Sequence, residues 1–329
     1  MDIFYQEMEQ LGYKFQNIKS KNGVKLIKHI INNRYNRELI LWIITNLSKN
    51  KNKLVHEIYD YIIENTDINY QTLIPYRNDY FECRIMFIHM CAIYGNTDLL
   101  DHLIRNDLNC VDSKDDNGTT PLMYASRLSN SISSLETVKL LLDKGADVNI
   151  QRKYESTALI LASMFSNSTS SIATVKLLLE YGANPDLYDF HEYTALNISV
   201  EYSDSTSSID NVKLLLDYKA NYDIENYEGD TPLIVATKML AVDIVRLLLE
   251  YGADPNHQNI KANTALMCLP PYTTDRNDNG KTIIRLLLNY NIDLNLKNIY
   301  GKTAYDLVSQ EYKELIILDG IFEDDEIRC

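Results

Sequence analysis

The chain has 329 residues, of which 45% are apolar and 24% are charged. This is the composition of a folded protein, so long disordered regions are not expected. The net charge of −14 disfavours general nucleic-acid binding by the chain as a whole, although residues 1–53 hold ten Lys and Arg against four Asp and Glu.

Residues 1–83 carry three stripes of apolar residues at helical spacing but no clean repeat. They predict a helical N-terminal cap, which could include one or two degenerate repeats, and a separate small helical domain is the alternative. The basic residues 14–53 leave open a third possibility, an arm that binds nucleic acid or an anionic membrane. The stripes are Val24, Ile27, Ile30 and Ile31; Leu39, Trp42, Ile43 and Leu47; and Leu54, Ile58, Tyr61 and Ile62.

The stretch 229–261 shows the unit on which most of the chain is built. Thr231 can cap a helix with its hydroxyl, and Pro232 suits the first helical position. Leu233, Val235 and Ala236 predict a short first helix, and Val242, Val245, Leu248 and Leu249 predict a second one. Gly252 follows where a left-handed residue is needed. One such helix pair cannot bury its own apolar face, so copies must stack.

Copies of this unit start at 118, 155, 192, 229, 262 and 301, at spacings of 37, 37, 37, 33 and 39 residues. Each of the first five has a Thr-(Pro/Ala)-Leu start, a Val-Lys-Leu-Leu-Leu-like second helix and a turn such as GADPN from Gly252. The last copy has only a weak start, KTAY from Lys302.

These residues resemble the ankyrin repeat, whose period is 33 residues and whose signature begins Thr-Pro-Leu-His. The resemblance covers roughly 84–310 and implies an all-α solenoid of helix–turn–helix units with short projecting turns and helical caps. The family's His is absent after every Thr-(Pro/Ala)-Leu start, where Met123, Ile160, Asn197, Ile234 and Met267 stand instead.

The repeat register divides the chain into segments. A divergent repeat spans 84–117, and a capping repeat with an acidic tail spans 301–329. Serine-rich inserts separate the helices of the first three of the five clear repeats and are read as solvated turns, with phosphorylation or contact as the alternative. Pro270 and Pro271 must end or shorten one first helix. The five clear repeats are 118–154, 155–191, 192–228, 229–261 and 262–300.

No catalytic, cofactor or metal constellation stands out. The six histidines form no HExxH or zinc spacing, no phosphate-binding glycine loop occurs, and the recurring Asp147, Asp254 and Asp293 are read as turn-stabilising groups. We therefore expect a non-enzyme without a cofactor. Five cysteines without a CxxC pair, no secretory signal and no apolar run long enough for a membrane span favour an intracellular, cytoplasmic protein.

The family resemblance implies a partner protein bound in the concave groove and at the turn tips, and we expect a monomer. The sequence predicts that the partner offers a basic or amphipathic segment and does not identify it further. An adaptor that links a target to a second machine, for example a ubiquitin ligase, is the alternative. The high Asn, Ile, Lys and Tyr content resembles ankyrin proteins of large DNA viruses, which would place the chain in host cytoplasm. The candidate contact residues are Arg127, Tyr154, Met164, Phe165, Phe190, Tyr202, Tyr227, Lys238, Met239, Ile260 and Tyr300.

Overall fold

The computed structural model describes residues 54–65, 73–77, 82–203, 208–270 and 279–318. The chain divides into two compact units, residues 1–153 and 154–329. The first two helical stripes, Trp42 and the basic residues 14–53 lie outside the described residues, as does the acidic tail after residue 318.

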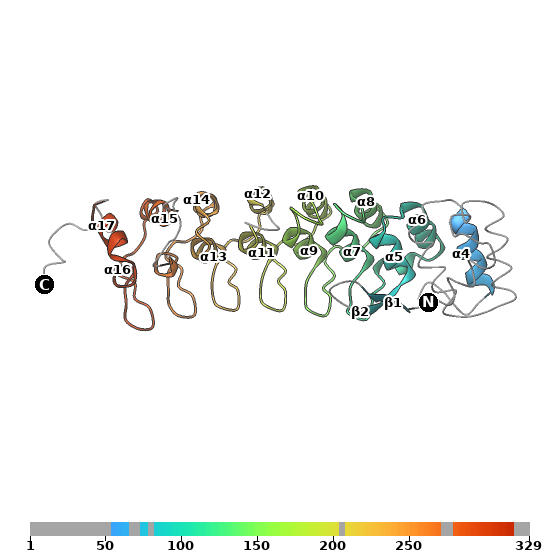
Figure 1. Cartoon of the computed structure of the whole chain (residues 1–329), viewed down its shortest axis with the longest axis horizontal. Helices are drawn as coiled ribbons and strands as arrows, with labels where there is room; N and C mark the ends of the chain where they lie inside the picture. The colour runs from blue at the N-terminus through green and yellow to red at the C-terminus, as the bar shows by residue number, and fades with distance from the viewer. Residues whose placement is uncertain (1–53, 66–72, 78–81, 204–207, 271–278, 319–329) are drawn as a thin grey trace, which may run out of the picture. The chain divides into compact units, whose positions relative to one another are not determined.

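The first unit is built from paired helices (Figure 1). α5 packs against α7, and α6 packs against both α4 and α8. The third helical stripe expected from the sequence is confirmed as α4, with Ile58 and Ile62 fully buried. The elements are α4 (Leu54–Asn65), α5 (Phe87–Ile93), α6 (Thr97–Asn106), the 3-10 helix η2 (Leu108–Asp112), α7 (Pro121–Leu128) and α8 (Leu135–Asp143).

A two-stranded antiparallel sheet precedes α5 and is a departure from the wholly helical cap predicted for residues 1–83. β1 (Leu73–Arg77) pairs with β2 (Glu82–Met86), with Leu73 opposite Met86 and Arg77 opposite Glu82. A helical reading fails here because Pro75 cannot donate a helical hydrogen bond, whereas a proline is tolerated in an edge strand.

The second unit is a stack of helix pairs. The first helices follow one another in contact, α9 with α11, α11 with α13, and α13 with η3, and the second helices do likewise from α10 to α15. Figure 1 shows their connecting turns projecting from one side of the stack. The elements are α9 (Ala158–Met164), α10 (Ile172–Glu180), α11 (Ala195–Glu201), α12 (Ile209–Asp217), α13 (Pro232–Lys238), α14 (Val242–Tyr251), η3 (Leu266–Cys268), α15 (Asn279–Leu288), α16 (Ala304–Leu307) and α17 (Gln310–Leu318).

Threonine caps start most of the first helices, as the motif predicts. The hydroxyls of Thr120, Thr157, Thr194 and Thr303 each accept from a backbone N–H three residues on. Thr231, the residue from which this cap was inferred, is the exception. Its hydroxyl is buried and makes no capping bond, so that detail of the prediction was wrong.

The serine-rich inserts end in the caps of the second helices. Ser134, Ser171 and Ser208 each accept an N–H bond from three residues on, at 3.3, 3.3 and 3.2 Å. The last serine of each insert therefore has a structural role that the reading as a solvated turn missed.

Special backbone geometry ends the second helices. Gly252 takes a left-handed conformation with φ of 101°, as predicted, and Lys219 and Asn291 adopt positive φ at the corresponding places. The first helix of the 262–300 repeat is reduced to η3, three residues that stop before Pro270, in agreement with the expected effect of the prolines.

Candidate functional site

The turns that precede the first helices share one hydrogen-bond pattern. In the second unit, the side-chain oxygens of Asp189, Asn226, Asn259 and Asn298 each accept two backbone N–H groups, from two and four residues further on. Asp and Asn are the residues whose short side chains reach their own backbone in this way. Hydrogen bonds within each turn therefore fix its shape independently of the neighbouring turns.

Backbone hydrogen bonds then join the tips of these turns in a row. The N–H groups of Phe190, Tyr227, Ile260 and Ile299 donate to carbonyl oxygens of the preceding tip, at Tyr154, His191, Glu228 and Lys261, over 3.2, 3.4, 3.3 and 3.1 Å. We call the residues 154, 190, 191, 227, 228, 260, 261, 299 and 300 the tip row. Its backbone groups are used internally, so the row presents its side chains outward.

Large apolar side chains of the tip row are exposed to solvent. The exposed fractions are 55% for Tyr154, 68% for Phe190, 56% for Tyr227, 67% for Ile260, 61% for Ile299 and 73% for Tyr300. Exposed apolar groups that lie singly need no explanation, but a row fixed at successive repeats is typical of interaction surfaces. The structure thus brings five of the sequence-derived candidates, Tyr154, Phe190, Tyr227, Ile260 and Tyr300, onto one feature.

The candidates at the ends of the first helices are less uniform. Tyr202 and Met239, the C-cap residues of α11 and α13, are exposed. Met164 and Phe165, at the end of α9, are half-buried. Arg127 is also half-buried and belongs to α7 in the first unit, whereas the tip row belongs to the second unit.

Lys238 is held within the fold. Its ammonium group lies 2.9 Å from Glu228 Oε2 and pairs with the buried carboxylate of Asp230. Although burial opposes it, hydrogen bonding to these two carboxylates raises the pKa of Lys238, and the same lysine lowers the pKa of Glu228. The repeat register predicts Lys238 as a contact residue, and in the structure its two ion pairs anchor the turn to α13.

An aromatic and acidic cluster forms part of the tip row. The Tyr227 ring lies 6.2 Å from that of Tyr193 and 6.1 Å from that of His191, centroid to centroid. Burial and then the Glu201 charge raise the pKa of Tyr193, and the Glu228 charge raises that of Tyr227. Tyr193 was not among the sequence candidates. Its place directly before Thr194, where the other repeats have Thr, Ser, Asp, Asn or Lys, was the available signal.

Family comparison agrees with this geometry. The model of the family "Ankyrin repeats (3 copies)" matches residues 20–152, 88–189, 129–226 and 159–259. The chain belongs to the ankyrin-repeat family. The all-α ankyrin solenoid is thereby confirmed, with the β1–β2 pair as an addition to it. Ankyrin-repeat domains generally mediate protein–protein interactions and are typically non-enzymatic scaffolds.

Curated relatives include viral ankyrin proteins. The chain is 48% identical to the putative ankyrin repeat protein L289 of Acanthamoeba polyphaga mimivirus over 59 residues, which cover 18% of this chain and 11% of that protein. It is 44% identical to the mimivirus protein R664 over 72 residues, 20% of this chain and 43% of that protein. It is 38% identical to the human DNA-binding protein RFXANK over 71 residues, 22% and 26% respectively. Less than half of each relative is spanned.

Two solved structures show the same fold over most of the chain. The ankyrin repeat domain of Bcl-3, described as a unique member of the IkappaB protein family, has a TM-score of 0.60 at 24% identity and covers 71% of this chain and 97% of its own. The ankyrin repeat domain of human ASB11 has a TM-score of 0.54 at 29% identity, with 70% and 96% covered.

One ankyrin signature residue was overlooked in the sequence. His89 is the third residue of α5, the place of the family's His after Thr-Pro-Leu, although no such triplet precedes it. Its Nδ1 accepts from Met86 N–H at 3.1 Å, so Nε2 carries the proton and donates to the carbonyl oxygens of Ser113 and Thr119, both at 3.0 Å. Burial lowers the pKa of this histidine. His89 therefore fastens the following turn to α5.

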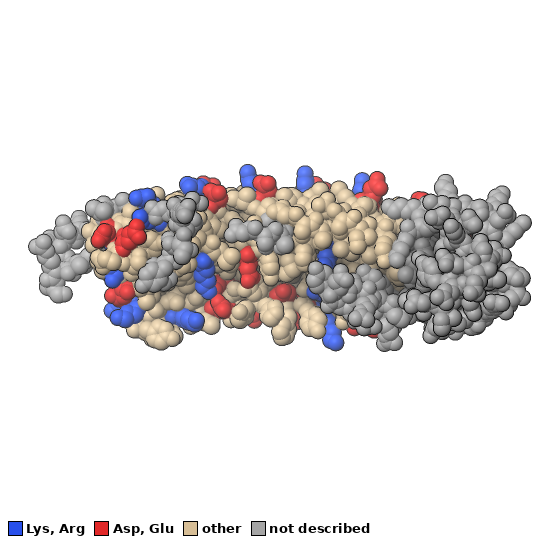
Figure 2. Space-filling model, viewed as in Figure 1, with Lys and Arg blue, Asp and Glu red and all other residues tan. Residues whose placement is uncertain are grey.

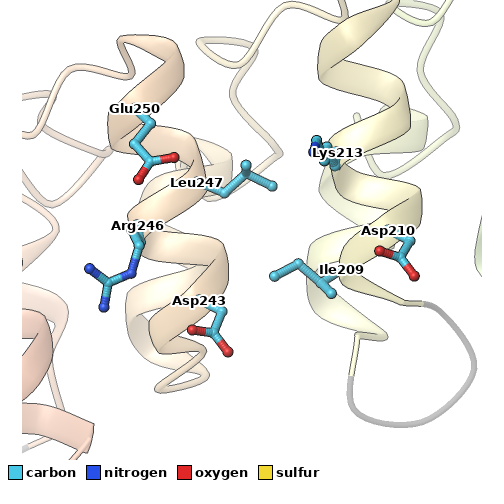
Figure 3. Close-up of a pocket in the computed structure, with 7 residues that line it drawn as sticks. All are labelled: Ile209, Asp210, Lys213, Asp243, Arg246, Leu247 and Glu250. Atoms are coloured by element: carbon cyan, nitrogen blue, oxygen red, sulfur yellow. The ribbon is translucent and has the colours of Figure 1, made fainter.

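A hollow of about 270 Å³ lies between the second helices α12 and α14 (Figure 3). Ile209, Asp210 and Lys213 line it from α12, and four residues line it from α14: Asp243, Arg246, Leu247 and Glu250. Three carboxylates and two cations share it, and none of them is buried. Because the charges are mixed and exposed, the hollow does not define a ligand.

Metal sites, membrane-spanning helices and reactive thiols are further features that could indicate a function in the part of the chain that the structure describes. Among those residues, no group of three His, Cys, Asp or Glu side chains is placed to hold a metal, and no helix could cross a membrane. Cys91, Cys110 and Cys268 are free thiols, and burial raises the pKa of all three, to about 12 for Cys110 and about 11 for Cys268. The recurring Asp147, Asp254 and Asp293 each accept an N–H two residues on, as expected of turn-stabilising groups.

Proposed function

We propose that this protein binds a partner protein through the tip row and the neighbouring first-helix ends of its second unit. One observation carries the proposal: six large apolar tip residues are more than half exposed, although their backbones are fixed by hydrogen bonds to the tips beside them. Turns fixed in this way lose little backbone conformational entropy when a partner covers them. The chain would then act by binding alone.

The first-helix ends would form the second wall of this surface. Tyr202 and Met239 are exposed there, and aromatic and methionine side chains are frequent anchors of interfaces. Met164 and Phe165 are half-buried and would contribute at its edge. Lys238 would contribute by holding Glu228 and its turn in place.

The test is capture of partners from cell lysate with the full chain and with two variants. The first variant carries Phe190→Ser, Tyr227→Ser and Ile260→Ser in the tip row. The second carries Ile209→Ser and Tyr290→Ser, which remove exposed apolar residues outside the tip row (40% and 37% exposed).

Partners lost with the tip-row variant and kept with the control variant support the proposal. Partners kept by both variants, with both proteins folded by circular dichroism, would place the binding surface elsewhere in the chain.

A further inference from the structure

The charges of the tip-row turns are divided along the stack. The turns 184–194 and 221–231 contain seven carboxylates and no Lys or Arg. The turns 254–264 and 293–303 contain three lysines and two carboxylates. Figure 2 accordingly shows Lys and Arg side chains along the lower edge at its left, C-terminal end, where the last turns project in Figure 1. Lys238 of α13 pairs with Glu228 and Asp230 and so neutralises part of the negative charge, but the remaining carboxylates leave the surface acidic at one end and weakly basic at the other.

The acidic half also carries the aromatic cluster. The ring of Tyr227 lies close to those of His191 and Tyr193, with Glu201 beside Tyr193, and Tyr227 donates to Glu228 Oε1 at 3.4 Å. Aromatic faces next to carboxylates favour a cationic side chain, because the ring quadrupole and the negative charges both attract it. The basic half offers Ile260, Ile299 and Tyr300 beside lysines instead.

The spacing of the tips favours a helix as the occupant. Packed helices lie about 8–10 Å apart, which sets the distance between successive tips. A helix advances about 10.5 Å in seven residues, so residues i, i+7 and i+14 can meet successive tips. An extended strand repeats one face about every 7 Å and does not match. The tip N–H groups are also already bonded to neighbouring tips, so no strand edge is available for pairing.

We propose that the partner segment is an amphipathic helix with separated charges. Its basic end lies over the turns 184–231 and its acidic end over the turns 254–303. This inference rests on the proposed function and adds the chemistry and the direction of the partner. Charge complementarity of this kind fixes register and orientation more than it adds affinity.

The test uses a synthetic 21-residue helical peptide with Leu at positions 1, 8 and 15, lysines in one half and glutamates in the other. A control peptide has the same composition with the charges interleaved. Two charge variants of the full chain are compared: Glu192→Lys with Glu225→Lys in the acidic half, and Lys261→Glu with Lys297→Glu in the basic half. All four positions are exposed, so the fold is expected to tolerate the changes.

We expect the separated peptide to bind at least tenfold more tightly than the interleaved one by fluorescence anisotropy at low salt. Either charge variant should weaken binding of the separated peptide about tenfold, because each reduces the charge difference between the two halves. The combined variant leaves both halves net negative, so it should bind the two peptides alike. A photo-crosslinker on the basic end should label residues 184–231 in the unchanged chain and both halves in the combined variant, and this loss of preference would demonstrate that charge sets the direction.

Equal binding of the two peptides by the unchanged chain, no binding of either, or a preference for the separated peptide that persists in the combined variant would overturn the charge-separated helix. The proposed function is judged separately, by the lysate capture with the tip-row variant. If tip-row changes abolish capture while the charge variants leave both capture and peptide binding unchanged, the surface stands and only its proposed occupant is wrong.

Discussion

The turn at 115–119 in the first unit and the turn at 226–230 in the second have the same internal hydrogen bonds. In each, one side-chain oxygen, of Asp115 or Asn226, accepts two N–H groups over 2.8–3.1 Å. They differ in how they are fastened to the helices. The first is held by the neutral imidazole of His89, and the second by the ion pair of Asp230 with Lys238.

This difference shows that turn shape and turn attachment are separate problems. The shape is local, because one Asp or Asn and its own backbone are enough to make it. The attachment needs a group from another element that can satisfy buried carbonyl or carboxylate oxygens. The neutral imidazole of His89 and the ammonium group of Lys238 both do so, but the two attachments respond differently to mutation and to pH.

The largest expected effect is at His89. A His89→Leu change would leave the carbonyl oxygens of Ser113 and Thr119 without this donor, and Met86 N–H without its acceptor. Each unsatisfied buried group costs about 1–3 kcal/mol, so we expect about 4 kcal/mol of lost stability. Urea unfolding followed by circular dichroism at 222 nm measures it. The control is His191→Leu, an exposed position, which should change stability by less than about 0.5 kcal/mol. Equal effects would show that His89 is not a fastening group.

The second effect compares Gly229 with Gly301, which share a φ of 72° at the same place in their repeats. A Cβ on Gly229 would lie 2.6 Å from the backbone nitrogen of Ile260, whereas one on Gly301 would meet nothing within 4 Å. Left-handed backbone alone costs an L-residue about 1–2 kcal/mol. We therefore expect Gly229→Ala to lower the free energy of unfolding by about 3 kcal/mol and Gly301→Ala to lower it by about 1 kcal/mol, measured in the same urea assay. Similar losses at both positions would mean that φ, and not contact with the next tip, limits the turn.

A smaller effect is expected at Lys238. Lys238→Met would leave the Asp230 carboxylate, 1% exposed, with Asn259 Nδ2 as a remaining donor at 2.7 Å. Because Lys238 is itself about one-third exposed, solvent screens part of the loss, and we expect about 2 kcal/mol. Lys213→Met on α12 is the exposed control and should cost little. Amide hydrogen exchange should rise at 226–231 in the first variant only, and unchanged exchange there would contradict the anchoring role.

The smallest effect is the pH dependence that His89 confers. Its pKa is lowered from 6.5 in the folded chain, so below pH 6.5 the unfolded chain binds a proton that the folded chain resists. The contribution of His89 to the free energy of unfolding is therefore fully present above pH 6.5 and decreases as the pH falls below 6.5. When the pH is lowered from 7.5 to 5.5, we expect the free energy of unfolding of the unchanged chain to fall by about 1 kcal/mol more than that of the His89→Leu variant. Urea unfolding at the two pH values measures both changes. Parallel losses in the two proteins would rule out His89 as the titrating group.

Much of the fold follows from the sequence alone. The period of 33–39 residues, the Thr-(Pro/Ala)-Leu starts and the 3.6-residue spacing of apolar positions correctly predicted stacked helix pairs, and Pro270 predicted a shortened first helix. These features depend on residues close together in the chain, which is why a pattern reveals them. The exposed tips at Phe190 and Ile260 were predicted for the same reason, since register alone places them.

Only the tertiary structure decided the features that depend on distant residues. His89 meets carbonyl oxygens 24 and 30 residues away, and β1 pairs with β2 next to helical stripes that had suggested a wholly helical cap. Lys238, expected at the surface, forms an ion pair with Asp230, and the hydroxyl of Thr231 makes no capping hydrogen bond. The sequence by itself determined the repeat and its register through local periodicity. The tertiary structure decided which polar groups hold one repeat to another, because burial and distance, and not spacing, select those partners.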